Sequence, residues 1–127
     1  MPDKHLYEYA VIRVVPRVER EEFINVGVVL FCKQQRYLKA RFRLDEHKLK
    51  TLSPGSDAAC IYPYLEAFAA ISAGVPNGSP IALLDPASRF RWLTATRSSV
   101  IQTSKVHPGF SNDLDKTLDK LFESLVL

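Results

Sequence analysis

The sequence has few of the residues that mark metal, redox and disulfide-stabilised proteins. It contains two cysteines, Cys32 and Cys60, and three widely separated histidines. Neither a CxxC nor an HxxxH spacing occurs, so we expect no metal site and no cofactor. Each cysteine lies in an apolar context, which favours two buried, reduced thiols over a disulfide.

Long apolar runs are also missing. No apolar run approaches the length of about 20 residues that a membrane-spanning helix needs. The first ten residues, MPDKHLYEYA, lack the apolar core of a signal peptide. We therefore expect a cytoplasmic protein without a membrane segment.

The chain has no basic or acidic tail. Seventeen Lys and Arg residues are interspersed with fourteen Asp and Glu, giving a net charge of +3, which permits an acidic partner without arguing for one. The 127 residues, 46% of them hydrophobic, fit one domain over residues 1–127. A chain of this size buries roughly two-thirds of its unfolded surface and needs no disulfide or metal to fold.

The centre of the fold is predicted at Phe23–Cys32, which reads FINVGVVLFC. From Val26 onward this is an unbroken apolar run rich in β-branched residues, typical of a strand buried on both faces. Gly27 predicts a bulge or a close backbone approach. A first strand is expected at Tyr7–Val15, ended by Pro16 because proline cannot donate to a sheet.

A hairpin is predicted from Val26–Lys33 and Tyr37–Leu44, joined by a short polar break. The second of these strands alternates apolar and polar residues, as a half-buried strand does. Its polar face carries a basic row that fits a nucleic-acid backbone. The row consists of Lys39, Arg41 and Arg43. It also fits a solvent-exposed sheet face, or pairing with carboxylates on a neighbouring element.

Three main helices are expected to pack on this small antiparallel sheet, giving one α+β domain. The first runs between Ser56 and Ala73, with Pro63 near its start or at a kink and Gly74 as its stop. The second begins at Asp85-Pro86, and the last carries a leucine stripe over 114–125.

Shorter elements complete the prediction. They are a short helix at Asp45–Leu52 capped by Asp45, a short strand or helix entry at Ile81–Leu84, a brief strand at Val100–Gln102, an irregular stretch at Thr103–Gly109, and a cap at Ser111 or Asn112 for the last helix.

A dense charge cluster, Arg17–Glu22, follows the first strand. Mixed-charge segments of this length are usually solvated loops or single helical turns with internal ion pairs. The alternative is the lip of a pocket that holds arginines beside carboxylates. Arg13 also stands out in the otherwise apolar first strand, where an arginine is usually paired or near the rim.

A second polar cluster is dense enough to suggest a site. Arg97 can bind a carboxylate or phosphate through two hydrogen bonds, and the hydroxyls and Gln102 can complete an anion pocket. His107 could act as an acid or a base. If Arg20, Glu22 and Asn25 approach from the first loop, a two-sided cleft results. The alternative is a loop held by its own side-chain hydrogen bonds. The cluster consists of Arg97, Ser98, Ser99, Gln102, Thr103, Ser104 and His107.

Catalysis by this cluster would use Arg97, Ser99 and His107. A Ser–His arrangement also needs an orienting carboxylate and an oxyanion hole. The sequence contains neither a nucleophile elbow nor a P-loop. No recognised catalytic template is therefore met.

Two separated motifs resemble those of a bacterial family known as a domain of unknown function, number 3037. The resemblance covers nearly the whole chain and implies a protein partner, a kinase resembling the toxin HipA. It carries no catalytic residues with it. The first motif comprises Tyr9, Arg13–Pro16, Arg20–Phe23 and Asn25–Leu30, and the second comprises Arg89–Leu93, Arg97–Ser104 and His107–Gly109.

The leading hypothesis is a non-enzymatic binding or accessory protein with a protein partner. One alternative is a small hydrolase or transferase with a Ser/His/Arg anion pocket, and the other is a weak nucleic-acid binder. The residues expected to bind a ligand or partner are Arg13, Arg20, Glu22, Asn25, Arg97, Ser98, Ser99, Gln102 and His107.

Overall fold

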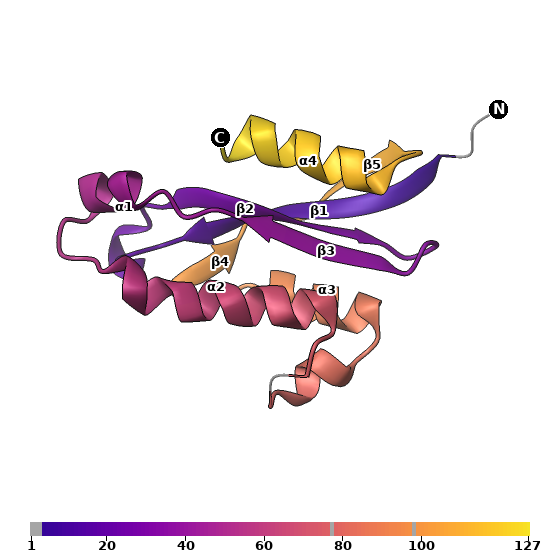
Figure 1. The fold of residues 1–127 in the computed structure, drawn as a ribbon, viewed down its shortest axis with the longest axis horizontal. Helices are drawn as coiled ribbons and strands as arrows, with labels where there is room; N and C mark the ends of the chain where they lie inside the picture. Colours follow the sequence, from indigo (N-terminus) through magenta and orange to yellow (C-terminus); the bar gives the residue numbers. More distant parts are fainter. Residues whose placement is uncertain (1–3, 77, 98) are drawn as a thin grey trace.

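The fold combines an antiparallel sheet with helices on both of its faces (Figure 1). The computed structural model describes residues 4–76, 78–97 and 99–127. Within them the expected α+β class is confirmed, but the sheet is larger than predicted. Its five strands are β1 (His5–Val14), β2 (Ile24–Cys32), β3 (Tyr37–Phe42), β4 (Ile101–Thr103) and β5 (His107–Ser111).

The sheet is ordered β3-β2-β1-β4, with β5 also paired to β1. β4 and β5 share one edge of β1: β4 pairs with Ile12–Val14, and β5 pairs with His5–Tyr9. The brief strand expected at Val100–Gln102 is confirmed as β4. The prediction of an irregular stretch at Thr103–Gly109 is wrong at its end. Residues 107–109 belong to β5, which pairs with the free edge of β1.

Each α-helix begins at an aspartate whose side chain accepts a backbone N–H of the first turn. The expected caps Asp45 and Asp85 are confirmed. The cap predicted for the last helix is wrong: Asp113 accepts from the Lys116 N–H at 3.1 Å, and Ser111 accepts from Asp113 N. The helices are α1 (Glu46–Leu52), α2 (Ala58–Ala73), α3 (Pro86–Thr94) and α4 (Leu114–Leu125).

Two 3-10 turns accompany these helices, η1 (Val18–Arg20) and η2 (Pro80–Leu83). η2 replaces the strand considered at Ile81–Leu84. Pro63 lies inside α2 rather than at its start, and Gly74 ends the helix with φ 71°, as expected. No described helix has both the length and the apolar character to cross a membrane.

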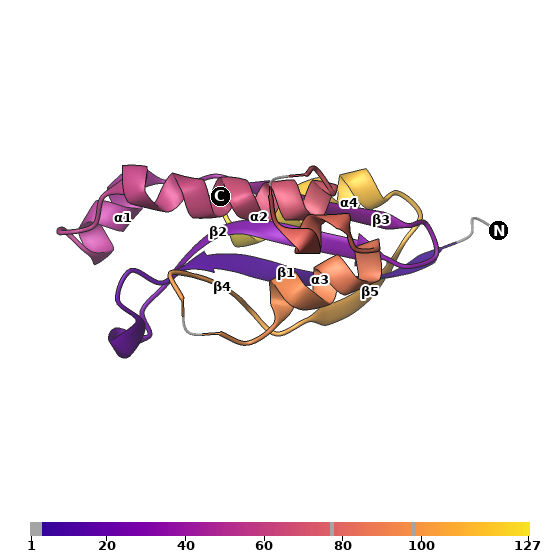
Figure 2. The ribbon, with the colours of Figure 1, turned by 90° about the horizontal axis from the view of Figure 1, so that it is seen from below.

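The sheet is covered on both faces. α2 and α3 lie against one face and α4 against the other (Figures 1 and 2). Strand β2 therefore contributes to two cores, with Val29 and Phe31 packing toward α2 and α3, and Val28 and Leu30 packing toward α4. This confirms the prediction of a central strand buried on both sides.

Gly27 sits where β2 approaches β3 most closely. A Cβ there would lie 2.5 Å from the Arg41 carbonyl oxygen and 2.9 Å from the Phe42 Cβ. The pairing with β1 also shifts beside it, so that Ile12 faces Gly27 while Arg13 faces Asn25. Both predictions for this glycine, a bulge and a close approach, are confirmed.

The two cysteines differ in exposure. Both are free, and Cys32 is buried in β2 as expected. Cys60 is exposed on α2, so the prediction of a second buried thiol is wrong. Its position on the helix faces away from the stripe of Ile61, Leu65 and Phe68 that packs on the sheet.

Candidate functional site

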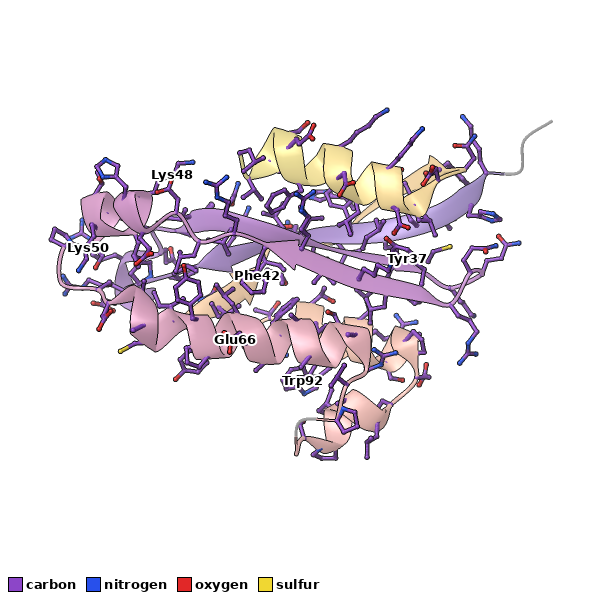
Figure 3. The ribbon with its side chains drawn as sticks, in the orientation of Figure 1. Tyr37, Phe42, Lys48, Lys50, Glu66 and Trp92 are labelled. Carbon is purple, nitrogen blue, oxygen red and sulfur yellow. The ribbon has the colours of Figure 1, made fainter. Side chains whose placement is uncertain are left out.

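A largely apolar groove of about 470 Å³ lies between α2, α3 and the segment that leads into β4. We call it the α2–α3 groove. Two of its aromatic side chains are exposed, Tyr64 (59%) from α2 and Trp92 (39%) from α3. Figure 3 shows Trp92 on the side of the molecule away from α4. The other lining residues are Ala67, Phe68, Ile71, Leu93, Ala95, Arg97, Ser99, Val100, Ile101 and Gln102.

Arg97 is fixed at the rim of this groove by Trp92. Its guanidinium carbon lies 4.2 Å from the centroid of the indole ring, and one terminal nitrogen donates to the Trp92 carbonyl. Stacking of this kind is a cation–π interaction. The pair presents a flat aromatic surface and a positive charge side by side.

The segment before β4 is held by its own side chains, the alternative considered from the sequence. Ser99 Oγ donates to the Ile101 carbonyl at 2.6 Å, and Gln102 Nε2 donates to the Ser99 carbonyl at 2.9 Å. Ser104 Oγ accepts the Val11 N–H at 2.8 Å, which ties the end of β4 to β1. Ser98 lies outside the described residues.

A second pocket, of about 480 Å³, lies beside β4 and shares Arg97 and Gln102 with the groove. We call it the Arg13 pocket. Arg13 and Gln102 are direct neighbours across β1 and β4, and Arg97 reaches this pocket as well as the groove. The first and second sequence clusters therefore meet here. The lining residues are Arg13, Val15, Val18, Glu21, Phe23, Thr96, Arg97 and Gln102.

Arg13 forms no salt bridge with a described carboxylate, one of the two arrangements expected for it, the other being a position near the rim. Its guanidinium carbon lies 4.1 Å from the centroid of the Phe23 ring. Its Nε is buried and has no hydrogen-bond partner among the described residues.

The other residues considered for a cleft, Arg20, Glu22 and Asn25, do not line this pocket. Arg20 and Glu22 pair with each other at 2.5 Å and line a separate pocket of about 430 Å³ beside residues 52–56. Asn25 Nδ2 donates to the Leu125 carbonyl at 3.2 Å and so ties β2 to α4. The two-sided cleft expected from Arg20, Glu22 and Asn25 does not form, because their side chains point to different neighbours.

His107 and Ser99 are not brought together. His107 is exposed on β5, where its ring lies 5.4 Å from the Tyr9 ring. In the described part of the chain no carboxylate or hydroxyl forms a hydrogen bond with it, whereas Ser99 is bonded within its own loop. The Ser–His arrangement that catalysis would need is absent from this geometry.

The basic row on β3 faces α4. Lys39 Nζ lies 3.1 Å from Asp115 Oδ1, and Arg41 donates to Asp119 at 2.7 Å. Tyr37, which Figure 3 labels at the same face, donates to Asp115 at 2.7 Å. Burial and this hydrogen bond raise the pKa of Tyr37, while the bonds from Tyr37 and Lys39 lower the pKa of Asp115. Two residues of the row, Lys39 and Arg41, thus have carboxylate partners, one of the arrangements predicted for the row; Arg43 lies just beyond the end of β3.

The charge cluster after β1 forms the single helical turn with internal pairs that its composition favours. Arg17 pairs with Glu19 at 3.0 Å beside η1, and Arg20 pairs with Glu22. Across the residues that the structure describes, no three His, Cys, Asp or Glu side chains are grouped so as to hold a metal ion.

Sequence reasoning missed the aromatic part of both sites, since it searched for polar clusters. Tyr64, Trp92 and Phe23 are exposed, yet a large apolar residue in a sequence usually indicates core. A signal existed in Tyr64, which lies off the stripe formed by Ile61, Leu65 and Phe68. An aromatic residue off such a stripe indicates a surface position.

The described residues form a small α+β protein with several surface pockets. A family model described as "Protein of unknown function (DUF3037)" matches residues 9–126. The chain belongs to this family, which confirms the resemblance seen in its two motifs. In the comparisons with curated proteins and with solved structures, no protein matches the chain.

Proposed function

We propose that this chain is a non-enzymatic binding protein that docks a protein partner in the α2–α3 groove. The observation that carries the proposal is the exposed Trp92 with Arg97 stacked on its ring at the rim of an apolar cavity. Tryptophan, tyrosine and arginine are the residues most enriched where protein interfaces concentrate their binding energy. Trp92, Arg97 and Tyr64 supply all three.

The composition of the groove fits an apolar anchor from a partner. Phe68, Ile71 and Leu93 are buried and form its floor, so the anchor would meet a packed surface. Ser99 and Gln102 lie at the β4 side and give a polar border. An apolar centre with a polar border is the usual anatomy of a specific interface.

The separation of Ser99 from His107 favours binding over catalysis as the role of the second motif. Its side chains hold a loop in place, and that loop forms one wall of the groove. The first candidate partner is a kinase resembling the toxin HipA, as the family resemblance implies. The kinase identity belongs to the proposal alone.

The test is affinity capture of the tagged chain at low salt, beside co-expression with a HipA-like kinase from the same host. Trp92→Ala should abolish stoichiometric capture, because truncating a central aromatic commonly costs about 2 kcal/mol or more. Phe110→Ala is the matched control, since Phe110 is an exposed aromatic (68%) that does not line the groove. Equal capture by both variants would contradict the proposal.

A further inference from the structure

The Arg13 pocket borders the α2–α3 groove, with which it shares Arg97 and Gln102, and it holds an arginine without a hydrogen-bond partner among the described residues. Arg13 forms no hydrogen bond or salt bridge with any described residue, and its Nε is buried. The Phe23 ring, 4.1 Å away, orients the guanidinium without accepting a hydrogen bond from its edge. An unsatisfied charged donor is costly in a folded protein, so an external acceptor would stabilise it.

Other polar residues line the same cavity. They include Thr96 and Arg97, whose guanidinium stacks on the Trp92 ring. Gln102 lies directly across from Arg13 and uses one amide N–H on the Ser99 carbonyl, which leaves its second N–H for a ligand. Forked guanidinium groups and amides of this kind bind planar oxyanions well.

The charge balance selects the kind of oxyanion. Two arginines and one glutamate, Glu21, line the pocket, so two positive charges against one negative leave a net charge of +1. A carboxylate monoanion matches that charge, whereas a phosphate dianion would exceed it. Val15, Val18 and Phe23 form an apolar wall for the part of the ligand next to its charged group.

From these observations we propose that the Arg13 pocket binds a carboxylate joined to an apolar group. The carboxylate contacts Arg13 and Arg97, and the apolar group packs on Phe23. Such a ligand is either a free small carboxylic acid or the C-terminus of a peptide. The pocket shares Arg97 and Gln102 with the α2–α3 groove, but Arg13 lines the pocket alone, so Arg13→Gln tests this proposal separately from partner docking.

The experiment uses two pairs of probes. Each pair consists of a carboxylate and the corresponding neutral amide. The first pair is 3-phenylpropanoate and 3-phenylpropanamide, and the second is N-acetyl-Ala-Ala-Phe with a free or an amidated C-terminus. Each is titrated into the ¹⁵N-labelled full chain and followed by NMR at the backbone amides and the arginine Nε–H groups. Inorganic phosphate is a fifth titrant.

We expect the Nε–H resonance of Arg13 and the amide of Gln102 to shift with the free acids, with an affinity at least about tenfold above that of the amides, which corresponds to about 1.4 kcal/mol. Arg13→Gln should weaken acid binding at least tenfold and leave amide binding unchanged. Arg17→Gln, an exposed arginine nearby that does not line the pocket, should bind as the wild type.

Should Arg13→Gln fail to fold, Gln102→Ala provides the same test from the facing strand. Tighter binding of the peptide acid than of phenylpropanoate assigns the site to a C-terminus, and the reverse order assigns it to a small acid. Equal binding of acid and amide, tighter binding of phosphate, or wild-type affinity in both variants would overturn the proposal. The docking proposal is judged separately by Trp92→Ala.

Discussion

Replacing Gly27 by alanine should force β2 and β3 apart, because the backbone of β3 leaves no room for a side chain there. The added Cβ would lie 2.5 Å from the Arg41 carbonyl oxygen. Real Cβ atoms essentially never approach closer than 3.0 Å, so β2 and β3 must separate by about half an ångström. Overpacking of this kind costs about 1–3 kcal/mol. Loss of one backbone hydrogen bond between the strands adds about 1 kcal/mol.

The free energy of unfolding of Gly27→Ala should therefore fall by about 2–4 kcal/mol relative to the wild type. The assay is urea denaturation followed by far-ultraviolet circular dichroism, with equal slopes required for the comparison. Gly55→Ala is the matched control, because nothing lies within 4 Å of a Cβ at that position. Its stability should change by less than about 1 kcal/mol. A Gly27→Ala midpoint equal to that of the wild type would refute the reasoning.

Three further predictions concern α4 and the thiols. Asp113→Ala should lower the free energy of unfolding by about 1 kcal/mol in urea denaturation, because the cap of α4 is lost, whereas an equal loss in Asn112→Ala would show the cap to be misassigned. The lowered pKa of Asp115 means that its contribution to stability is present above the unfolded pKa of about 3.9 and is lost as the pH falls through the lower folded value. The stability difference between wild type and Asp115→Asn, measured by denaturation from pH 6 to pH 2, should thus shrink on acidification, and a constant difference would contradict this. Cys60 should react with a thiol reagent in the native protein and Cys32 only on unfolding; equal rates would show that the two thiols do not differ in exposure.

Much of the sheet could be predicted because its signals are local. The apolar run in Val26–Cys32 has no polar alternation, which predicts burial on both faces. The alternation in Tyr37–Leu44 predicts which side chains face α2. The Asp45 and Asp85 caps follow from contacts within four residues of chain. Signals of this kind can be recognised in a sequence because they do not depend on tertiary contacts.

Strand β5 could not be predicted because its stability comes from a distant partner. Its sequence, HPGFS, has a proline and a glycine and reads as a turn. It becomes a strand because residues His5–Tyr9 of β1 leave a free edge after β2 takes the other one. The exposure of Cys60, by contrast, could have been predicted, because Cys60 lies off the stripe of Ile61, Leu65 and Phe68 on the same helix face as Tyr64.

The candidate sites combine residues that could be predicted from local signals with contacts that depend on distant parts of the chain. The polar residues of the second motif were recognised, and three of them, Arg97, Ser99 and Gln102, do line cavities. Their meeting with Arg13 depends on β4 pairing beside β1, a contact between residues almost ninety positions apart. Charge and hydrogen-bonding capacity are visible in a sequence, but the register of an edge strand is not.

The most direct measurement on the docking proposal uses Trp92, the one tryptophan of the chain. A chain labelled with 5-fluorotryptophan has a single ¹⁹F resonance, which reports on the environment of the α2–α3 groove alone. Titration with the captured partner, or with the HipA-like kinase, should shift this resonance and slow its paramagnetic relaxation by a dissolved agent, because the ring becomes covered. A complex that forms with the resonance and its relaxation unchanged would show that the partner binds elsewhere.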